Sequence, residues 1–240
     1  VRLIDCVGYM VPSALGQMDG DQPRMVMTPW FDHEIPMTEA AEFGTQKVIT
    51  DHSTIGIVVT TDGSVTDIPR EDYLEAEERV ISELKGLGKP FMVLLNSAQP
   101  YSERAQTLQA DIAERYDVTC LAANCLTLDE GAVSEIIQAV LHEFPMKQMD
   151  LFLPPWVDVL PFDHPIKSGL YAMIREETEG LQRLRDAEGA VLAMGDREEV
   201  SSAVLNRMDM GSGVVTATLE LPRALFYSTV SERCGLEIRD

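Results

Sequence analysis

The chain has 240 residues, of which 40 are acidic and 19 basic, so its formal net charge is −21. Hydrophobic residues make up 45% of it, which is typical of globular proteins and excludes a disordered acidic segment. The negative charge argues against nucleic-acid binding and against direct docking on an anionic membrane.

Apolar strands alternate with helices through the first part of the chain. Residues 1–5 are predicted to form a short buried strand that ends in the carboxylate of Asp5, and a Gly- and Pro-rich stretch follows to about Pro36. β-Branched and apolar runs predict further strands over residues 54–60, 91–96 and 118–122. Helices are predicted over residues 39–49, 68–85 and 102–116 and after a capping box formed by Thr127 and Glu130.

Two of these helices carry an apolar stripe. The stripe of the second helix consists of Tyr73, Ala76, Val80 and Leu84. That of the fourth consists of Val133, Ile136, Ile137, Val140 and Leu141. Strands separated by such helices imply a parallel sheet covered on both faces, with ligands bound at the carboxyl ends of the strands.

A change in charge near residues 145–150 marks a predicted domain boundary. Residues 1–145 carry a net charge of −15, and residues 146–240 carry −6. In the second part we predict an extended segment over 151–160, helices over 165–187 and 198–208, and strands over 214–221 and 226–231. This pattern indicates a smaller α+β domain.

Neither a membrane span nor a disulfide framework is expected. The longest apolar runs fall well short of the roughly 18 residues that cross a bilayer, and no signal peptide is recognisable. The four cysteines lack a C-x-x-C spacing, so they are expected to be reduced thiols of a cytosolic protein. Because the chain opens at Val1 inside a predicted strand, we interpret it as a fragment.

The clearest candidate for chemistry is the Asp5-x-x-Gly8 pattern at the end of the first predicted strand. In P-loop NTPases such a carboxylate holds a magnesium water, and the glycine lets a backbone N–H approach the γ-phosphate. The same pattern recurs at Asp186-x-x-Gly189, which we interpret as a helix end. From the pattern alone, a simple turn after a strand is the favoured interpretation.

A second candidate is Asn96-Ser97, which follows another buried strand. GTPases carry an Asn-Lys-x-Asp element at this place, whose Asp binds the guanine edge. Here position 99 is Gln, which lacks a carboxylate, so guanine selection is poorly supported. Asn96 and Ser97 could equally begin the next helix.

Other patterns favour structural roles. Asp32-His33-Glu34 and Asp51-His52-Ser53 lack metal-ligand spacing, and no G-x-S-x-G elbow is present. The segment Gly86-Leu87-Gly88-Lys89-Pro90 ends a predicted helix, and no G-x-x-x-x-G-K-[ST] phosphate loop occurs in the 240 residues.

Four stretches resemble the stage IV sporulation protein A family of spore-forming Firmicutes. They are residues 1–12 (VRLIDCVGYMVP), 27–36 (MTPWFDHEIP), 51–64 (DHSTIGIVVTTDGS) and 95–97 (LNS). The resemblance implies a P-loop NTPase fold of the translation-factor GTPase type, here without its N-terminal P-loop strand. It also implies a partial nucleotide-binding (ATPase) domain without Walker A over residues 1–145, followed by a middle domain over residues 146–240.

Function and site residues are likewise implied by this resemblance. Asp5 is expected to be the catalytic magnesium residue and Gly8, Asn96 and Ser97 to bind nucleotide, with ATP and Mg²⁺ as cofactors. ATP hydrolysis would drive self-assembly into the basement layer of the spore coat, in the mother-cell cytoplasm at the forespore surface. Expected partners are further copies, a small amphipathic forespore-membrane peptide and other coat proteins, the latter two through regions outside this chain.

Two alternatives remain open: a structural assembly protein in which hydrolysis is incidental, and a GTPase of the same fold. The chain alone is expected to be inactive, because the P-loop is missing from it.

Overall fold

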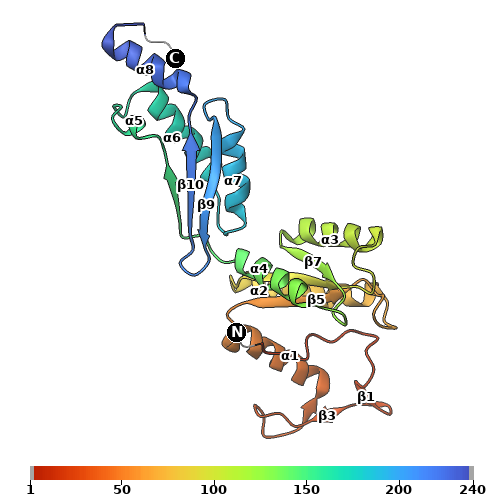
Figure 1. The fold of residues 1–240 in the computed structure, drawn as a ribbon. Helices are drawn as coiled ribbons and strands as arrows, with labels where there is room; N and C mark the ends of the chain where they lie inside the picture. Colours follow the sequence, from red (N-terminus) through yellow and green to blue (C-terminus); the bar gives the residue numbers. More distant parts are fainter. Residues whose placement is uncertain (1–2, 238–240) are drawn as a thin grey trace. The chain divides into compact units, whose positions relative to one another are not determined.

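The computed structural model describes residues 3–237 (Figure 1). Two compact units divide the chain, one of residues 1–140 and one of residues 141–240. None of the helices in the described residues has the length and apolar character to span a membrane.

A parallel three-stranded sheet forms the centre of the first unit. Its strands are β5 (Gly56–Thr61), β6 (Phe91–Asn96) and β7 (Cys120–Ala123), in the order β5-β6-β7. β6 is buried along nearly its whole length, as its continuous apolar run predicts. All three strands therefore present their carboxyl ends at the same edge of the sheet.

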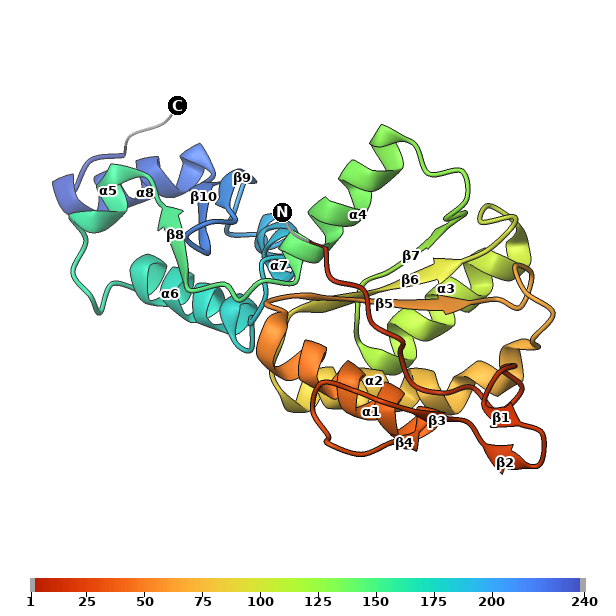
Figure 2. The same ribbon diagram turned by 90° about the horizontal axis from the view of Figure 1, so that it is seen from below.

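Helices cover both faces of this sheet, as predicted (Figure 2). α2 (Leu74–Gly86) and α3 (Glu103–Tyr116) pack against one face and α4 (Glu130–His142) against the other. The buried residues that α2 and α3 share with the sheet include Ile81, Leu84, Ile112, Val93 and Leu95. Those that α4 shares with it are Ile136, Val140, Met92 and Leu94.

Details of these helices differ from the predictions. α2 follows a short 3₁₀ turn (Arg70–Tyr73), and its buried positions are Glu77, Ile81 and Leu84. Of the predicted stripe, Leu84 is buried and Val80 is partly buried against the core, whereas Glu77 and Ile81 were not predicted to face inward. α4 is capped by Asp129, whose Oδ1 accepts from Ala132 N at 2.8 Å, so the predicted Thr127 capping box is wrong.

Short pairings organise the N-terminal residues. The two-residue strands β1 (Met18–Asp19) and β2 (Gln22–Pro23) pair antiparallel, as do β3 (Met25–Val26) and β4 (Ile35–Pro36). α1 (Met37–Lys47) follows and continues into one π-helical turn (Val48–His52).

The first predicted strand is not formed in the described residues. Residues 1 and 2 of that prediction lie outside them, and Leu3, Ile4 and Asp5 are exposed and non-regular. A strand exists only where a neighbour accepts and donates its backbone hydrogen bonds. Within residues 3–237 no strand pairs with this segment, so its apolar character alone does not produce one.

Lys89 closes the end of the π-helical turn. Its ammonium group donates to the carbonyl oxygens of Thr50 at 2.9 Å and Ser53 at 2.6 Å, and also to that of Ile49. The segment from Gly86 to Pro90 therefore ends one helix and caps another, as its position after a helix indicates.

The second unit combines a mixed sheet with helices. Its strands are β8 (Gln148–Phe152), β9 (Ser202–Asp209) and β10 (Val214–Glu220), in the order β8-β10-β9. β10 runs parallel to β8 and antiparallel to β9, with a bulge at Thr216/Ala217. Its helices are α5 (Pro155–Asp158), α6 (Pro165–Thr178), α7 (Asp186–Gly195) and α8 (Arg223–Cys234).

The helix predicted over residues 165–187 is two helices. Gly180 has a φ of 82°, and the chain turns there before α7 begins. Leu184 is fully buried in that connection. Asp186 therefore starts a helix instead of ending one, and its Oδ2 accepts from the N–H groups of Gln182 and Arg183.

Two further predictions in this unit are wrong. Residues 202–209 form β9 instead of a helix, because pairing with β10 satisfies their backbone groups and outweighs the local helix pattern. Residues 226–231 lie in α8 instead of a strand. Pro222, with a φ of −56°, sits at its N-terminal cap, and the Thr229 hydroxyl is buried against Leu225 O.

Candidate functional site

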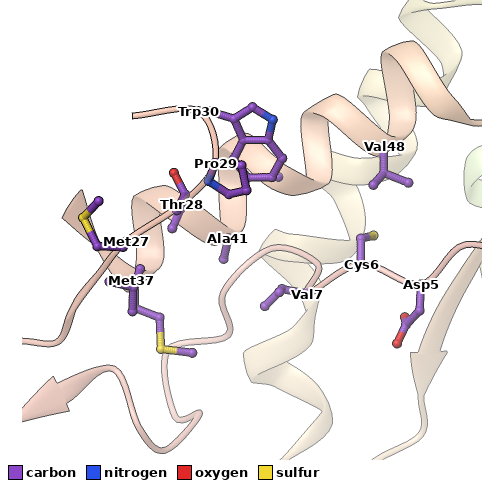
Figure 3. Close-up of a pocket in the computed structure, with 13 residues that line it drawn as sticks. Asp5, Cys6, Val7, Met27, Thr28, Pro29, Trp30, Met37, Ala41 and Val48 are labelled. Carbon is purple, nitrogen blue, oxygen red and sulfur yellow. The ribbon is translucent and has the colours of Figure 1, made fainter. Parts of the chain in front are cut away.

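Asp5 lies at the mouth of an apolar pocket of about 330 Å³. The pocket is formed by Asp5, Cys6 and Val7 of the N-terminal segment, the loop that carries Trp30, and one side of α1. Figure 3 shows Cys6 near Val48 and Val7 near Ala41. Gly8 follows with a φ of 79°, a left-handed conformation in which any other residue would be strained.

Side-chain contacts hold this N-terminal segment on α2 and on the 3₁₀ turn that precedes it. The Tyr9 hydroxyl donates to Glu83, and the Arg79 guanidinium lies 4.2 Å from the centre of the Tyr9 ring. Ser13 donates to Asp72. Burial, reinforced by the hydrogen bond to Glu83, raises the pKa of Tyr9, so the phenol stays protonated. The turn at Gly8 is therefore fixed in place by the residues that follow it.

The pocket matches only part of what a nucleotide requires. The Asp5 carboxylate is exposed and suits a hydrated Mg²⁺. The residues around the pocket include no Lys or Arg, whereas a triphosphate requires cations and converging N–H groups. In residues 3–237 no group of three or more His, Cys, Asp or Glu is placed to hold a metal ion. The residues around Asp5 therefore lack the cations of a phosphate cradle.

Asn96 and Ser97 occupy the carboxyl end of β6, as predicted from the run before them. Asn96 Oδ1 accepts from Cys125 N at 3.1 Å and so shapes the loop after β7. Ser97 is fully buried, and its hydroxyl donates to Asp62 Oδ2 at 2.6 Å. The pocket around Asp5 includes neither residue. The structure therefore brings Asn96 and Ser97 together in one cluster and places Asp5 and Gly8 in another.

Asp62 is the centre of the first cluster and was missed in the sequence. It follows β5 and is buried, and its carboxylate accepts from Ser64 as well as from Ser97. Burial opposes its ionisation, but the hydrogen bonds from Ser64 and Ser97 outweigh burial and lower the pKa of Asp62. The Asp-Gly-Ser turn after a strand was the available signal. Its hydrogen bond with Ser97, 35 residues away, could not be predicted from the sequence.

Replacing Ser97 by Ala should raise the folded-state pKa of Asp62 and lower the free energy of unfolding at neutral pH by roughly 1–2 kcal/mol. Because the native pKa lies below the unfolded value, ionised Asp62 stabilises the fold above the unfolded pKa. That contribution is lost as the pH falls through the native pKa. Urea titrations at neutral and acidic pH should therefore show that the free energy of unfolding falls less steeply with decreasing pH in the variant than in the wild type.

The matched control is Ser134→Ala, at an exposed position of α4. It should change neither the stability nor the slope of its pH dependence. Equal losses in the two variants would contradict a specific role for the Ser97 hydroxyl.

A buried ion pair lies beside the end of β5. Arg70 Nη1 is 2.6 Å from Glu77 Oε2, and Arg70 Nη2 donates to Glu77 Oε1 at 2.8 Å. Arg70 Nη1 also donates to Thr60 Oγ1 of β5 at 2.8 Å. The Glu77 side chain is only 2% exposed. Because the predicted stripe of α2 omitted Glu77, this pair too was missed.

The cysteines should differ sharply in reactivity. Cys6 and Cys234 are exposed, whereas Cys120 is buried. Burial, with the nearby Glu77 carboxylate, raises the pKa of Cys120 to about 12. Ellman's reagent should label Cys6 and Cys234 rapidly and leave Cys120 unmodified until urea is added. A Cys6→Ser/Cys234→Ser variant should lose the fast phase, and rapid labelling of Cys120 would contradict the structure.

Two family models match the chain: the ATPase domain of stage IV sporulation protein A over residues 1–145, and the middle domain of the same protein over residues 146–240. The chain belongs to the stage IV sporulation protein A family. This confirms the resemblance seen in the four sequence stretches.

Curated members of the stage IV sporulation protein A family are similar over the whole of the chain. It is 43% identical to those of Bacillus subtilis (strain 168) and Bacillus anthracis, each over 239 residues. It is 42% identical over 238 residues to that of Clostridioides difficile (strain 630). The alignments cover 99–100% of this chain but 48–49% of the relatives, so the chain spans about half of their length. No solved structure matches it significantly.

Proposed function

We propose that the chain is the central part of a sporulation ATPase whose turnover drives assembly of the spore coat. The observation that carries this proposal is the match of residues 1–145 to the ATPase domain of the family. The parallel sheet with helices on both faces supports it, since NTPases of this kind bind nucleotide at the carboxyl ends of such strands.

In this proposal residues 1–145 are a partial nucleotide-binding domain of the translation-factor type, without its P-loop strand, and residues 146–240 are the middle domain. Asp5 holds Mg²⁺ through its carboxylate, and Gly8 offers a backbone N–H to the terminal phosphate. Mg²⁺ supplies charge neutralisation for phosphoryl transfer. The cations that hold the phosphates come from residues outside this chain, because those around the Asp5 pocket include no Lys or Arg.

Asn96 and Ser97 are proposed to lie near the base. Gln99 replaces the carboxylate by which GTPases select guanine, which favours ATP over GTP. The proposed partners are further copies of the protein, a small amphipathic forespore-membrane peptide and other coat proteins. The proposed place of action is the mother-cell side of the forespore surface.

Nucleotide turnover by the full-length protein tests this proposal. Phosphate release should be clearly faster with ATP than with GTP and should require Mg²⁺. Equal turnover of both nucleotides would favour a GTPase of the same fold. Normal filament assembly in the absence of any turnover would favour a structural protein in which hydrolysis is incidental.

The isolated chain provides a second test. Calorimetric titration with MgATP should give no measurable heat of binding, because the phosphate-holding loop and its lysine are missing from these 240 residues. Submillimolar affinity would contradict the assignment of the phosphate site to residues outside the chain.

A further inference from the structure

A cleft of about 430 Å³ runs along the outer edge of β7. α3 forms one wall through Gln106 and Gln109, and α4 forms the other through Ala132, Glu135 and Ile136. Figure 2 shows these two helices on opposite sides of the sheet at β7. The cleft is therefore open at the level of the sheet, where a further strand would lie.

The backbone of β7 is paired with a strand on one side only. Within residues 3–237 its sole partner strand is β6, in the order β5-β6-β7. Thr119 O and Ala123 O accept from β6 and the residue after it. Because alternate residues of a strand direct their N–H and C=O groups to opposite sides, those of Cys120 and Ala122 face the cleft.

Gln109 partly occupies this edge. Its Oε1 accepts from Ala122 N at 3.2 Å, so a flexible side chain bonds the group to which a strand would otherwise pair. Natural proteins protect such edges with lysines, prolines or bulges. No residue around the cleft is basic, and β7 itself contains no proline. Only side-chain rearrangement is required to expose the Ala122 N–H.

The walls of the cleft determine which peptide would fit. Leu121, Leu128 and Ile136 offer apolar contacts, and Gln106, Gln109 and Asn124 offer amide groups. The charged residues around it, Asp129 and Glu135, are both acidic. The first 145 residues carry a net charge of −15, which also favours a basic partner.

We propose that the outer edge of β7 binds an extended, basic peptide segment of a partner protein by strand addition. The segment pairs its backbone with Cys120 and Ala122, displaces the Gln109 side chain and directs a Lys or Arg toward Asp129 and Glu135. β7 has four residues, so the paired length is about 13 Å at a rise of about 3.3 Å per residue. Backbone pairing gives affinity and alternate side chains give specificity. This proposal does not depend on nucleotide hydrolysis.

The test uses ¹⁵N-labelled chain titrated with acetyl-Lys-Val-Lys-Val-Lys-Val-amide. Saturable shifts are expected at the backbone amides of residues 119–124 and at the Gln109 side-chain amide. The analogue with Glu in place of Lys should bind at least about tenfold more weakly. A fully N-methylated Lys-Val peptide, which keeps the charge but cannot donate backbone hydrogen bonds, should not bind.

Two variants test whether the Ala122 N–H takes part in binding. Ala122→Pro removes an N–H that faces the cleft and not β6, so peptide binding should be lost while thermal stability changes little. Gln109→Ala frees that N–H without altering the backbone and should retain or strengthen binding. If the proline variant does not fold, the N-methylated peptide still decides whether backbone pairing is required.

Several outcomes would overturn the proposal. They are the absence of shifts up to ~1 mM peptide, shifts confined to another surface, and equal binding of the acidic or the N-methylated peptide. Protection of the Cys120 and Ala122 amides from hydrogen exchange in the full-length protein without a partner would also overturn it. In that case a segment of the same protein would already occupy the edge.

Discussion

Replacing Asp5 by Asn in the full-length protein is expected to lower ATP turnover by at least about 100-fold, equivalent to roughly 2.7 kcal/mol of transition-state stabilisation. Asn keeps the size of the side chain but removes the charge that is proposed to hold Mg²⁺. Because Asp5 is exposed, stability should not change. Phosphate release at saturating MgATP measures the effect, and a thermal melt verifies the fold.

The matched control is Asp32→Asn. Asp32 is also exposed and lies in the same N-terminal segment, but outside the Asp5 pocket. It should leave turnover unchanged. If the Asp5 variant keeps more than about half of the wild-type activity, Asp5 does not hold the metal. If it loses turnover but still assembles filaments, hydrolysis does not drive assembly.

Replacing Glu77 by Gln is expected to lower the free energy of unfolding of the first unit by roughly 3–5 kcal/mol. The Arg70 guanidinium would keep its charge in a site where its side chain is 10% exposed and would lose its charged partner. Since domains are stable by only about 5–15 kcal/mol, this loss would bring the unit close to unfolding at ambient temperature. Urea denaturation followed by circular dichroism measures it.

Two further variants separate the ion pair from the position on the helix. Glu78→Gln changes the next residue of α2, which is exposed, and should cost less than about 0.5 kcal/mol. Arg70→Met/Glu77→Leu removes both charges and should recover much of the loss, because no unpaired charge is left buried. A loss below about 1 kcal/mol for Glu77→Gln would show that water reaches Arg70.

Local pattern predicted the sheet of the first unit because its strands are strongly apolar. The run from Phe91 to Asn96 is β6 residue for residue, and Ser102 caps α3 by accepting from Ala105 N. The parallel order with helices on both faces follows from the alternation of strands and helices along the sequence.

Pairing between strands that are distant in the sequence determined those elements that the local sequence pattern failed to predict. Residues 202–209 form a strand because β10 lies beside them, and residues 3–5 do not because no described strand pairs with them. The Asp62–Ser97 and Arg70–Glu77 pairs depend on which side chains face inward at the ends of strands and helices. When periodicity predicts an apolar stripe and a charged residue beside it also faces inward, as Glu77 does on α2, such a pair is missed.

The attachment of Tyr9 to α2 has a consequence for how Asp5 can respond to a ligand. Tyr9 bonds Glu83, and Arg79 covers its ring while also reaching Glu42 of α1. Any movement that draws Tyr9 and the residues before it away from the helices must break these contacts together. A ligand that repositions Asp5 in this way must supply the free energy of breaking these contacts. Ligand affinity and the strength of this attachment are therefore thermodynamically linked.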